Sequence, residues 1–341
     1  MIRKSFWSLS AILLLRAGVL ALLLASVAIA RAEPFRLKIA AVGSPPSMHN
    51  LFMQVAVEEG FFKKNGIEVQ NFMEMRAGTL ATQALSSGKI DVTETDVEGV
   101  LNAASAGGFG GVAVSAPAQH LSYVVAVAKE IQSFKDLVGK PVAISRPGAI
   151  SQVLMFPFLD REKIDRKSIV WVPIGGASER RLSLLGGRVK AALLHLDFAL
   201  QAERDGQVHR LDTVANANPD YPHELLVVRK ELAEQHPEVV TAIVRSVIEA
   251  CRFIATHRER TIEIYEKHTG DKDPALAGTA YDALIAIKAY GVNGGMTRKG
   301  LDAALKLAVE NGSISEPLPI ENWADFRFQD EAVKQLGQLP E

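Results

Sequence analysis

The sequence predicts an α/β protein built from two lobes and a helical C-terminal region. From residue 37 onward, short apolar runs alternate with stretches of helical pattern, as βαβ units around a mainly parallel sheet do. The same alternation begins again after Gly139, and from residue 229 the chain becomes mostly helical. Two copies of one design, each a sheet flanked by helices, therefore account for the chain before residue 229.

The composition is that of a folded protein large enough for two domains. The chain has 341 residues, of which 48% are hydrophobic and 23% are charged. A chain of this length buries enough apolar surface to fold without disulfides or metal ions. Its 38 Lys and Arg residues balance its 39 Asp and Glu residues, which argues against a nucleic-acid-binding protein.

Residues 1–32 have the features of a secretory signal peptide. Arg3 and Lys4 form a positive start, Ala17 to Ala30 is an uncharged apolar run, and Ala30-Arg31-Ala32 is a cleavage pattern. The 14 residues of the run are fewer than the ~20 that span a bilayer as a helix. We expect residues 1–32 to be removed and the mature protein to be periplasmic, with an uncleaved membrane anchor as the alternative.

Turn residues divide the first half into strands and helices. Gly43 to Ser47 ends the first apolar run, while Gly60 and Gly88 follow two stretches of helical pattern. The strands are expected at 37–42, from 67 onward, at 90–92, at 111–115 and at 122–128, and the helices at 49–60 and 79–87.

The second half repeats this order before the helical region begins. Strands are expected at 141–145, 169–173 and 189–194, with helices at 150–160, 178–186 and 197–205. The C-terminal helices are expected at 237–256, 259–268, 275–290 and 297–311, before a proline-containing tail at 315–322. A weak internal repeat supports two similar lobes, since residues 84–92 and 183–191 both combine a helix end, a glycine turn, a basic residue and a strand.

Loops at the carboxyl ends of the strands are the expected ligand site, as in other open parallel sheets. They are rich in Gly, Ser and Thr, whose small size lets backbone N–H groups approach a ligand, although turns and helix caps favour the same residues. The candidate ligand-binding residues are Ser47, Met48, His49, Gly78, Thr79, Thr95, Asp96, Arg146, Gly148, Ala149, Ser151, Gly176, His195 and Asp197.

The charged candidates suggest an anionic ligand. Arg146 follows a strand, where its guanidinium could grip a carboxylate, sulfonate or phosphate; a surface arginine is the alternative. His49 and His195 fall at equivalent junctions of the two halves and could donate to an oxyanion or stack on a ring. Asp96 and Glu98 would instead favour an amine or neutralise Arg146, unless Asp96 only caps a helix.

Known catalytic and metal-binding motifs are missing from the sequence. It contains no P-loop and no G-x-S-x-G nucleophile turn. His223 to Val227 begins like H-E-x-x-H but has valine in place of the second histidine. The single cysteine, Cys251, excludes an intrachain disulfide and a multi-cysteine metal site, and its apolar surroundings predict a buried thiol. We expect no catalytic residue, metal or cofactor; a triad assembled only in the fold remains an alternative.

Five stretches resemble the periplasmic substrate-binding proteins of ABC transporters. The resemblance is to the branch that binds nitrate, sulfonates, taurine and thiamine-precursor pyrimidines. The stretches are 57–69, 83–92, 131–143, 146–149 and 184–192. Two features depart from that branch: Lys190 replaces a frequent acid, and the expected cleft loops have few aromatic residues, which disfavours a flat pyrimidine.

The resemblance implies a type II fold of two lobes joined by two crossing strands. Lobe 1 would hold residues 33–123 plus 228–341 and lobe 2 residues 124–227, with crossings near Ser122–Ala126 and Glu224–Val228. A small organic anion, similar to a sulfonate, taurine or a carboxylate, would bind in the cleft. The closed monomer would deliver it to a membrane ABC permease with its ATPase. An exported enzyme or a ligand sensor on the same fold is the alternative.

The single cysteine gives a first prediction. The melting temperature of the mature chain should not change when a thiol reductant is added, because one cysteine cannot form an intrachain disulfide. Differential scanning calorimetry with and without reductant measures this. A shift with reductant would instead indicate dimers linked through Cys251.

Overall fold

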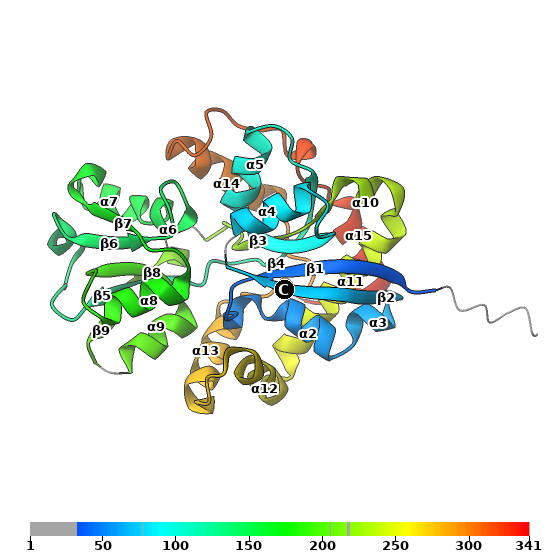
Figure 1. Cartoon of the computed structure of the whole chain (residues 1–341), viewed down its shortest axis with the longest axis horizontal. Coiled ribbons are helices and arrows are strands. Elements are labelled where there is room, and N and C mark those ends of the chain that lie inside the picture. Colours follow the sequence, from blue (N-terminus) through cyan, green and yellow to red (C-terminus); the bar gives the residue numbers. More distant parts are fainter. Residues whose placement is uncertain (1–32, 77, 205, 217–218, 341) are drawn as a thin grey trace, which may run out of the picture. The chain divides into compact units, whose positions relative to one another are not determined.

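The computed structural model describes residues 33–76, 78–204, 206–216 and 219–340 (Figure 1). The strands and helices described below belong to one compact unit, Phe35–Glu341. The expected signal peptide at residues 1–32 lies outside the described residues. None of the helices in the described ranges is long and apolar enough to cross a membrane.

The first sheet has the strand order β2-β1-β3-β10-β4. Strands β2, β1, β3 and β4 run in one direction, and β10 runs opposite to its neighbours β3 and β4. Its strands are β1 (Phe35–Val42), β2 (Ile67–Met75), β3 (Val92–Asp96), β4 (Gly111–Ala118) and β10 (Glu224–Arg229).

The second sheet repeats this plan in the order β7-β6-β8-β5-β9. Here β5 is the strand that runs opposite to both of its neighbours. The strands are β5 (Tyr123–Ala128), β6 (Pro141–Ile144), β7 (Val170–Pro173), β8 (Ala191–His195) and β9 (Val208–Thr213). The predicted α/β class with two mainly parallel sheets is confirmed, and each sheet is mixed because of one reversed strand.

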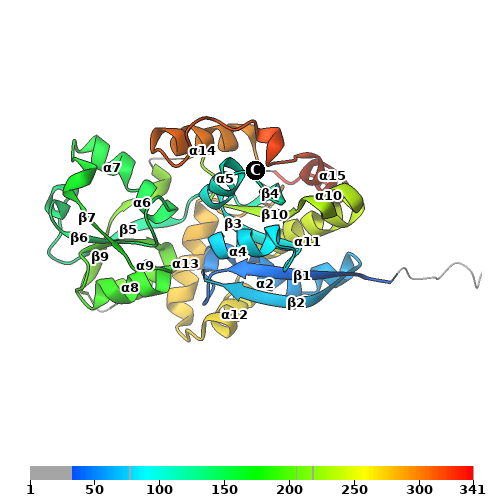
Figure 2. The ribbon, with the colours of Figure 1, turned by 45° about the horizontal axis from the view of Figure 1, so that its top comes forward.

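Helices flank both sheets and form the C-terminal region (Figures 1 and 2). The α-helices are α2 (Phe52–Glu58), α3 (Phe61–Lys64), α4 (Gly78–Ser86), α5 (Val97–Ser105), α6 (Ile150–Val153), α7 (Phe156–Arg161), α8 (Ala177–Leu185), α9 (Leu196–Glu203), α10 (Lys230–Gln235), α11 (Pro237–Thr256), α12 (Arg258–Thr269), α13 (Pro274–Ala286), α14 (Arg298–Glu310) and α15 (Arg327–Leu336). The short 3-10 helices are η1 (Met48–Asn50), η2 (Phe134–Leu137), η3 (Arg166–Ser168), η4 (Val214–Asn216) and η5 (Ile320–Asn322).

Both faces of the first sheet are buried. On β10, Leu225 and Val227 belong to the apolar cluster that includes residues of α4 and α5. The alternate residues Leu226 and Val228 belong to a second cluster with residues of α2 and α11. Because successive side chains of a strand point to opposite faces, the sheet is covered on both sides.

Two expected helices are divided in the structure. The helix expected at 49–60 becomes η1 and α2, and α3 follows Gly60, whose φ of 71° is left-handed. The helix expected at 150–160 is divided into α6 and α7, with Pro157 in the first turn of α7. Proline is favoured in a first turn because its missing N–H has no partner there, so the sequence begins a new helix at this point.

Strand β3 starts and ends later than expected. The sequence predicted a strand at 90–92 and a loop from Thr93 to Asp96, whereas β3 spans Val92–Asp96. The prediction was wrong because the polar residues of β3 have the composition of a loop. In the structure Thr93, Glu94 and Thr95 are fully buried. The strand thus carries acidic side chains into the interior.

The predicted internal repeat corresponds to equivalent parts of the two sheets. Residues 84–92 lead from α4 into β3, residues 183–191 lead from α8 into β8, and both strands are the middle strand of their sheets. The neighbouring ion pairs have opposite polarity. Before β3, Asp91 binds Arg229 at the end of β10 (3.0 Å).

Lys190 takes the corresponding place before β8. It binds Glu130, which lies two residues after the end of β5 (2.6 Å). Lys190, a base where the resembled family often has an acid, therefore pairs with an acidic residue, whereas Asp91 pairs with a basic one.

The chain crosses between the sheets twice, from β4 to β5 and from β9 to β10. The crossings lie side by side, because the N–H of His223 donates to the carbonyl of Ala118 (2.9 Å). The N–H of Ser122 in turn donates to His223 Nδ1 (3.4 Å).

The return crossing ends earlier in the chain than expected. Residues 124–227 were expected in the second lobe, but Glu224–Arg229 forms β10 and pairs with β3 and β4. Residues 224–227 therefore lie in the first sheet. An apolar strand has the same pattern whichever sheet it joins, so the sequence did not reveal this.

The predicted burial of the thiol is confirmed. Cys251 is fully buried in α11, and its Sγ lies 3.7 Å from the carbonyl oxygen of Pro117. Burial raises the pKa of the Cys251 thiol, so it stays protonated and unreactive.

The two ion pairs of opposite polarity should differ in their effect on stability. Asp91→Asn should lower the free energy of unfolding by about 1–2 kcal/mol, because the carboxylate also accepts the N–H of Lys38 (2.9 Å) and is mostly buried. Lys190→Gln is the matched comparison and should have a much smaller effect, because its partner Glu130 is exposed. Urea denaturation of both variants measures the difference, and equal effects would contradict this ranking.

Candidate functional site

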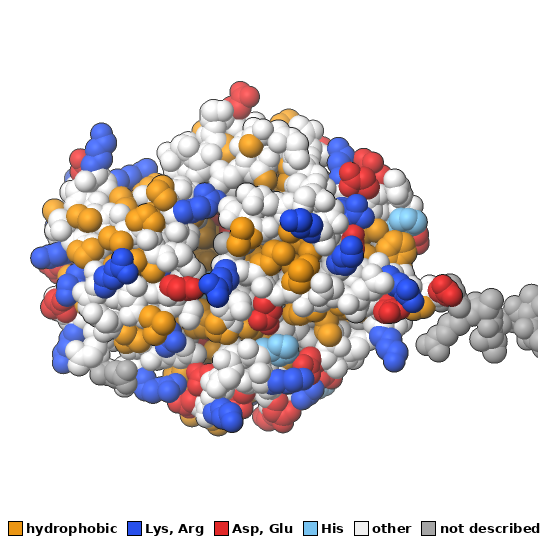
Figure 3. All heavy atoms as spheres, in the orientation of Figure 1, with side chains coloured by type: hydrophobic (Ala, Val, Ile, Leu, Met, Phe, Trp, Pro, Cys, Tyr) orange, Lys and Arg blue, Asp and Glu red, His pale blue; other side chains and the backbone are white. Residues whose placement is uncertain are grey.

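A cavity of about 410 Å³ lies where the strand ends of the two sheets face each other. The first sheet contributes residues of the loop that follows β1, together with Arg76, Gly78, Thr79, Asp96 and Glu224. The second sheet contributes lining residues from its loops and from α8. Figure 3 shows a hollow on this face of the molecule with basic and acidic side chains beside it. Its size suits a small organic molecule.

Nine of the fourteen candidate residues line this cavity. They come from six segments that are distant in the sequence, which the fold brings together. They are Ser47, Gly78, Thr79, Asp96, Arg146, Ala149, Ser151, Gly176 and His195. Their contact with a ligand remains a prediction.

The other five candidates do not line the cavity. Met48, His49 and Asp197 are buried behind its wall. Thr95 is also fully buried, whereas Gly148 is half-buried and donates its N–H to Gln152 (2.8 Å). These residues can support the wall but do not form it.

Thr95 explains why a glycine occupies the start of α4. A Cβ placed on Gly78 would lie 2.2 Å from Thr95 Oγ1 and 2.8 Å from Asp96 Oδ2. The two elements can approach this closely only without a side chain at residue 78. Without a side chain at residue 78, the first turn of α4 can pack against β3 and line the cavity wall.

Sequence reasoning missed six charged or aromatic residues of the wall, and three of them are the most buried charged or aromatic groups at β5, α8 and β10. Arg180, Tyr123 and Glu224 all line the cavity. A signal was present for Arg180, which lies one helical turn before the buried Leu184 and so on the inward face of α8. Tyr123 and Glu224 begin strands β5 and β10, and their role depends on how the strands pair.

Arg180 is a buried cation held by the backbone. Its Nη1 donates to the carbonyl of Gly175 (2.6 Å), and Nε and Nη2 donate to the carbonyl of Leu193 (3.3 and 3.2 Å). The residue is only 4% exposed. In the described part of the chain, no carboxylate forms an ion pair with it. Burial lowers the pKa of the guanidinium, and the exposed Glu179 offsets this in part.

Arg146 lies at the edge of the cavity and is exposed. It faces Asp96, whose Oδ1 accepts the N–H of Gly99 (2.7 Å) and so caps α5. Burial raises the pKa of Asp96 and Glu224 raises it further, while the Gly99 hydrogen bond and Arg146 lower it. The helix cap considered from the sequence is therefore present, and among the described residues Asp96 and Arg146 form no ion pair.

Buried acids lie behind the first-sheet side of the cavity. Glu94 Oε1 accepts the N–H of Val42 (2.7 Å), while its Oε2 has no partner among the described residues. Burial raises the pKa of Glu94, and the charge of Glu224 raises it further. Burial likewise raises the pKa of Glu98 to about 8, beside the hydroxyl of Tyr221 that donates to it.

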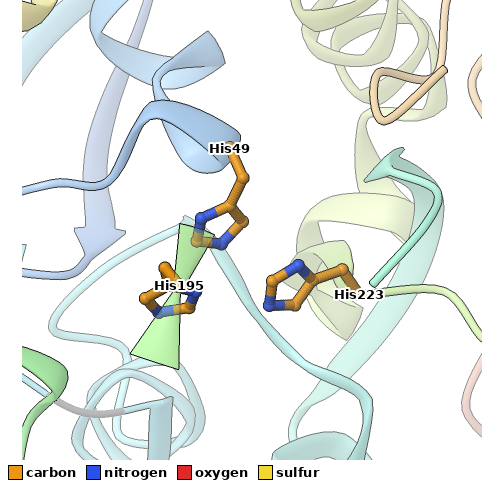
Figure 4. Close-up of side chains that lie close together, drawn as sticks. All are labelled: His49, His195 and His223. Atoms are coloured by element: carbon orange, nitrogen blue, oxygen red, sulfur yellow. The ribbon is translucent and has the colours of Figure 1, made fainter. Parts of the chain in front are cut away.

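Three histidine rings lie close together beside the cavity (Figure 4), and the ring of Tyr123 packs against two of them. The His49 ring lies 4.2 Å from the ring of His195 and 4.1 Å from that of His223. The Tyr123 ring contacts the same two rings at 4.4 and 4.5 Å. The stack joins η1, the start of β5, the end of β8 and the return crossing that contains His223.

The rings are packed as a stack rather than as a metal centre. The donor nitrogens of His49, His195 and His223 lie within 4.8 Å of one another. However, the His49 plane is tilted by only 23° and 7° from the other two. Ring nitrogens bind metals in the plane of the ring, so near-parallel rings do not direct three nitrogens at one ion.

His195 and His223 are held neutral in this stack. Burial lowers the pKa of each ring well below the usual value, and the neighbouring His49 lowers it further. His195 Nδ1 and His223 Nε2 are buried without a partner among the described residues.

A chain of hydrogen bonds connects the two sheets behind the cavity. Asp197 at the start of α9 accepts the hydroxyl of Ser47 (2.7 Å), the N–H of Met48 (2.9 Å) and the hydroxyl of Tyr265 (3.0 Å). Ser47 Oγ lies 2.9 Å from Nδ1 of His49. The buried Asp197 is thus bound by residues on the side of the first sheet.

Comparison with known proteins identifies the family. Residues 48–261, more than half of the chain, match the family model described as NMT1/THI5 like. The chain therefore belongs to the NMT1/THI5-like family. No curated protein sequence matches the chain.

Solved structures show the fold. A protein of Bordetella bronchiseptica RB50 is 18% identical with a TM-score of 0.77, covering 90% of this chain and 99% of that one. The aliphatic sulphonate-binding protein SsuA of Escherichia coli is 19% identical with a TM-score of 0.68, covering 85% and 91%. The nitrate-binding protein NrtA of Synechocystis PCC 6803 is 13% identical with a TM-score of 0.70, covering 89% and 90%. The fold is that of the periplasmic binding proteins, as the resemblance predicted.

The buried Glu98 makes stability depend on pH. Its folded pKa of about 8 exceeds the ordinary glutamate pKa of 4.5, so between these values the folded state holds a proton that the unfolded state has lost. The stability that this proton gives is complete below about pH 4.5 and is lost as the pH rises towards 8. Glu98→Gln should therefore become more stable relative to the unmodified protein as the pH rises, by up to about 5 kcal/mol.

Urea denaturation of both proteins across this pH range measures the effect. The glutamine can still accept the Tyr221 hydroxyl, which keeps the packing comparable. Two stability curves that stay parallel from low to high pH would show that Glu98 does not carry this proton.

Proposed function

We propose that the protein is a periplasmic solute-binding protein that captures a small organic anion in the cavity and delivers it to an ABC permease. The expected solutes are sulfonates, taurine-like compounds and carboxylates. The observation that carries this proposal is Arg180, a buried guanidinium at the cavity wall with no carboxylate partner among the described residues.

An anionic solute would complete the surroundings of this cation. A buried charge is costly unless an opposite charge and hydrogen bonds compensate it. Arginine has five N–H donors, and three are used on the carbonyls of Gly175 and Leu193. One N–H on each terminal nitrogen is left, which suits two oxygens of a carboxylate or sulfonate.

The helix N-termini at the cavity add to this preference. Gly176 caps α8 and Ala149 caps α6, and neither cap forms a side-chain hydrogen bond. Gly176 lines the cavity together with Ala177 and Ser178, the first residues of α8, and the first backbone N–H groups of a helix have no partner within the helix. Together with Arg180, the start of α8 would attract a negative group.

Closure of two lobes around the solute is the proposed mechanism. Lobe 1 would hold the first sheet with the C-terminal helices, and lobe 2 would hold the second sheet. This division would replace the expected boundaries, which were 33–123 plus 228–341 for lobe 1 and 124–227 for lobe 2. A solute that contacts both walls would favour the closed form, which would then dock on the permease. The two adjacent crossings would serve as the hinge, and the protein would act as a monomer.

The same fold suits a sensor or an enzyme, but no specific observation favours either. The Ser47 hydroxyl lies beside His49, as a nucleophile would, yet it donates to Asp197. A hydroxyl held in this way is not directed at a substrate. We therefore propose a binding protein without catalytic residues.

The experiment compares two arginines of the cavity. Melting temperatures of residues 33–341 are measured with sulfonates, taurine, nitrate and carboxylates; solute at about 100 times its Kd should add about 2.7 kcal/mol of stability. Arg180→Gln should weaken the anion that binds by about 1.5–3 kcal/mol. Arg146→Gln should weaken it less, because Arg146 is exposed and faces Asp96. Equal effects, or no response to any anion, would refute the proposal.

A further inference from the structure

We propose that the solute is a zwitterion and that Glu224, held by His49, binds its protonated nitrogen while Arg180 binds its acid group. This inference rests on the proposed function and names the substrate class of the same cavity. It also makes Glu224 a specificity-determining residue.

Glu224 brings a buried carboxylate to the cavity wall. The residue is 5% exposed and lines the cavity. Its Oε1 lies 3.2 Å from His49 Nε2, and its Oε2 has no hydrogen-bond partner among the described residues. A carboxylate can accept about four hydrogen bonds, so this one has capacity for a further donor.

The hydrogen-bond chain behind the wall fixes the protons. Ser47 has one hydroxyl proton and donates it to Asp197, so its oxygen accepts from Nδ1–H of His49. His49 Nε2 and Glu224 Oε1 then need a proton between them, because two acceptors do not bind each other. The hydrogen bond between His49 Nε2 and Glu224 Oε1 therefore contains one proton, and this bond orients the carboxylate.

Glu224 and Arg180 act on the cavity from different walls. Tyr123 lines the cavity and is within electrostatic reach of both. Burial raises the pKa of its hydroxyl, Arg180 lowers it, and Asp96 and Glu224 raise it. Because Arg180 belongs to α8 beside the second sheet and Glu224 to β10 of the first sheet, a solute in the cavity meets a positive group from one sheet and negative groups from the other.

The acids on the first-sheet side repel one another. Glu224 lies opposite Asp96 on the paired strands β10 and β3, and Glu94 is two residues before Asp96. The charge of Glu224 raises the pKa of both neighbours. A cationic nitrogen at this wall would relieve that repulsion and would release a proton from the acids. A simple anion such as nitrate offers no group for this wall.

The test uses pairs of compounds that differ only in the amino group. Taurine is compared with ethanesulfonate, and β-alanine with propionate, by isothermal titration calorimetry at constant pH. The amino compound of the binding pair should bind roughly 10- to 100-fold more tightly, the value of a charge-assisted hydrogen bond. Titration in buffers of different ionisation enthalpy should show proton release for the amino compound only.

Variants connect this preference to Glu224. Glu224→Gln keeps the size and the His49 contact but should remove most of the preference for the amino compound, leaving its partner within about threefold. Glu331→Gln on α15 removes a half-buried acid outside the cavity lining and is the matched control. Circular dichroism and melting of each variant establish that it is folded.

The results of these titrations distinguish failure of the zwitterion proposal from failure of the proposed anion-binding function. Binding without a preference for the amino compound, or a preference that Glu224→Gln leaves intact, overturns the zwitterion proposal and keeps the anion-binding function. Binding by none of the four compounds overturns the proposed function for sulfonates and carboxylates, and the zwitterion proposal with it.

Discussion

The carboxylate of Asp197 is the interaction on which the arrangement of the site depends. It starts a helix of the second sheet, yet its donors Ser47, Met48 and Tyr265 lie on the side of the first sheet. A charged group with three donors is strongly bound in the interior. Because Ser47 also contacts His49, the orientation of that ring, and through it of Glu224, depends on the same carboxylate. The contact between the two halves and the shape of the cavity wall are therefore set together.

The fold could be predicted well because it depends on local patterns. Apolar runs, glycine turns and proline positions identify most strands and helices, and a repeat of nine residues indicates that the middle strands of both sheets are equivalent. Two kinds of element were harder to recognise. β3 is a buried strand of polar residues, and β10 is an apolar strand whose sheet is chosen by long-range pairing. Sequence periodicity reports the burial of a face but not the partner that buries it.

The site could be predicted only in part for the same reason. Loops at strand ends are recognisable from the sequence, and nine of the fourteen candidates do line the cavity. The sequence did not indicate which charged side chains of the wall are buried. Arg146 stands out in a loop but is exposed, whereas Arg180 is inconspicuous in a helix but buried. Glu224 gains its surroundings from His49, 175 residues away. Burial and counter-charge are properties of the assembled fold, so a single sequence gives only a weak indication of them.

The opposite polarity of the two equivalent ion pairs has a consequence for folding. The halves share one plan, so each reversed strand meets two similar docking places while the chain folds. If β5 paired with β3, Glu130 would approach Asp91, and if β10 paired with β8, Arg229 would approach Lys190. Both mistaken pairings bring like charges together, whereas the native ones bring opposite charges together. The opposite polarity of the two ion pairs therefore favours the native strand pairing in each half over the exchanged pairing.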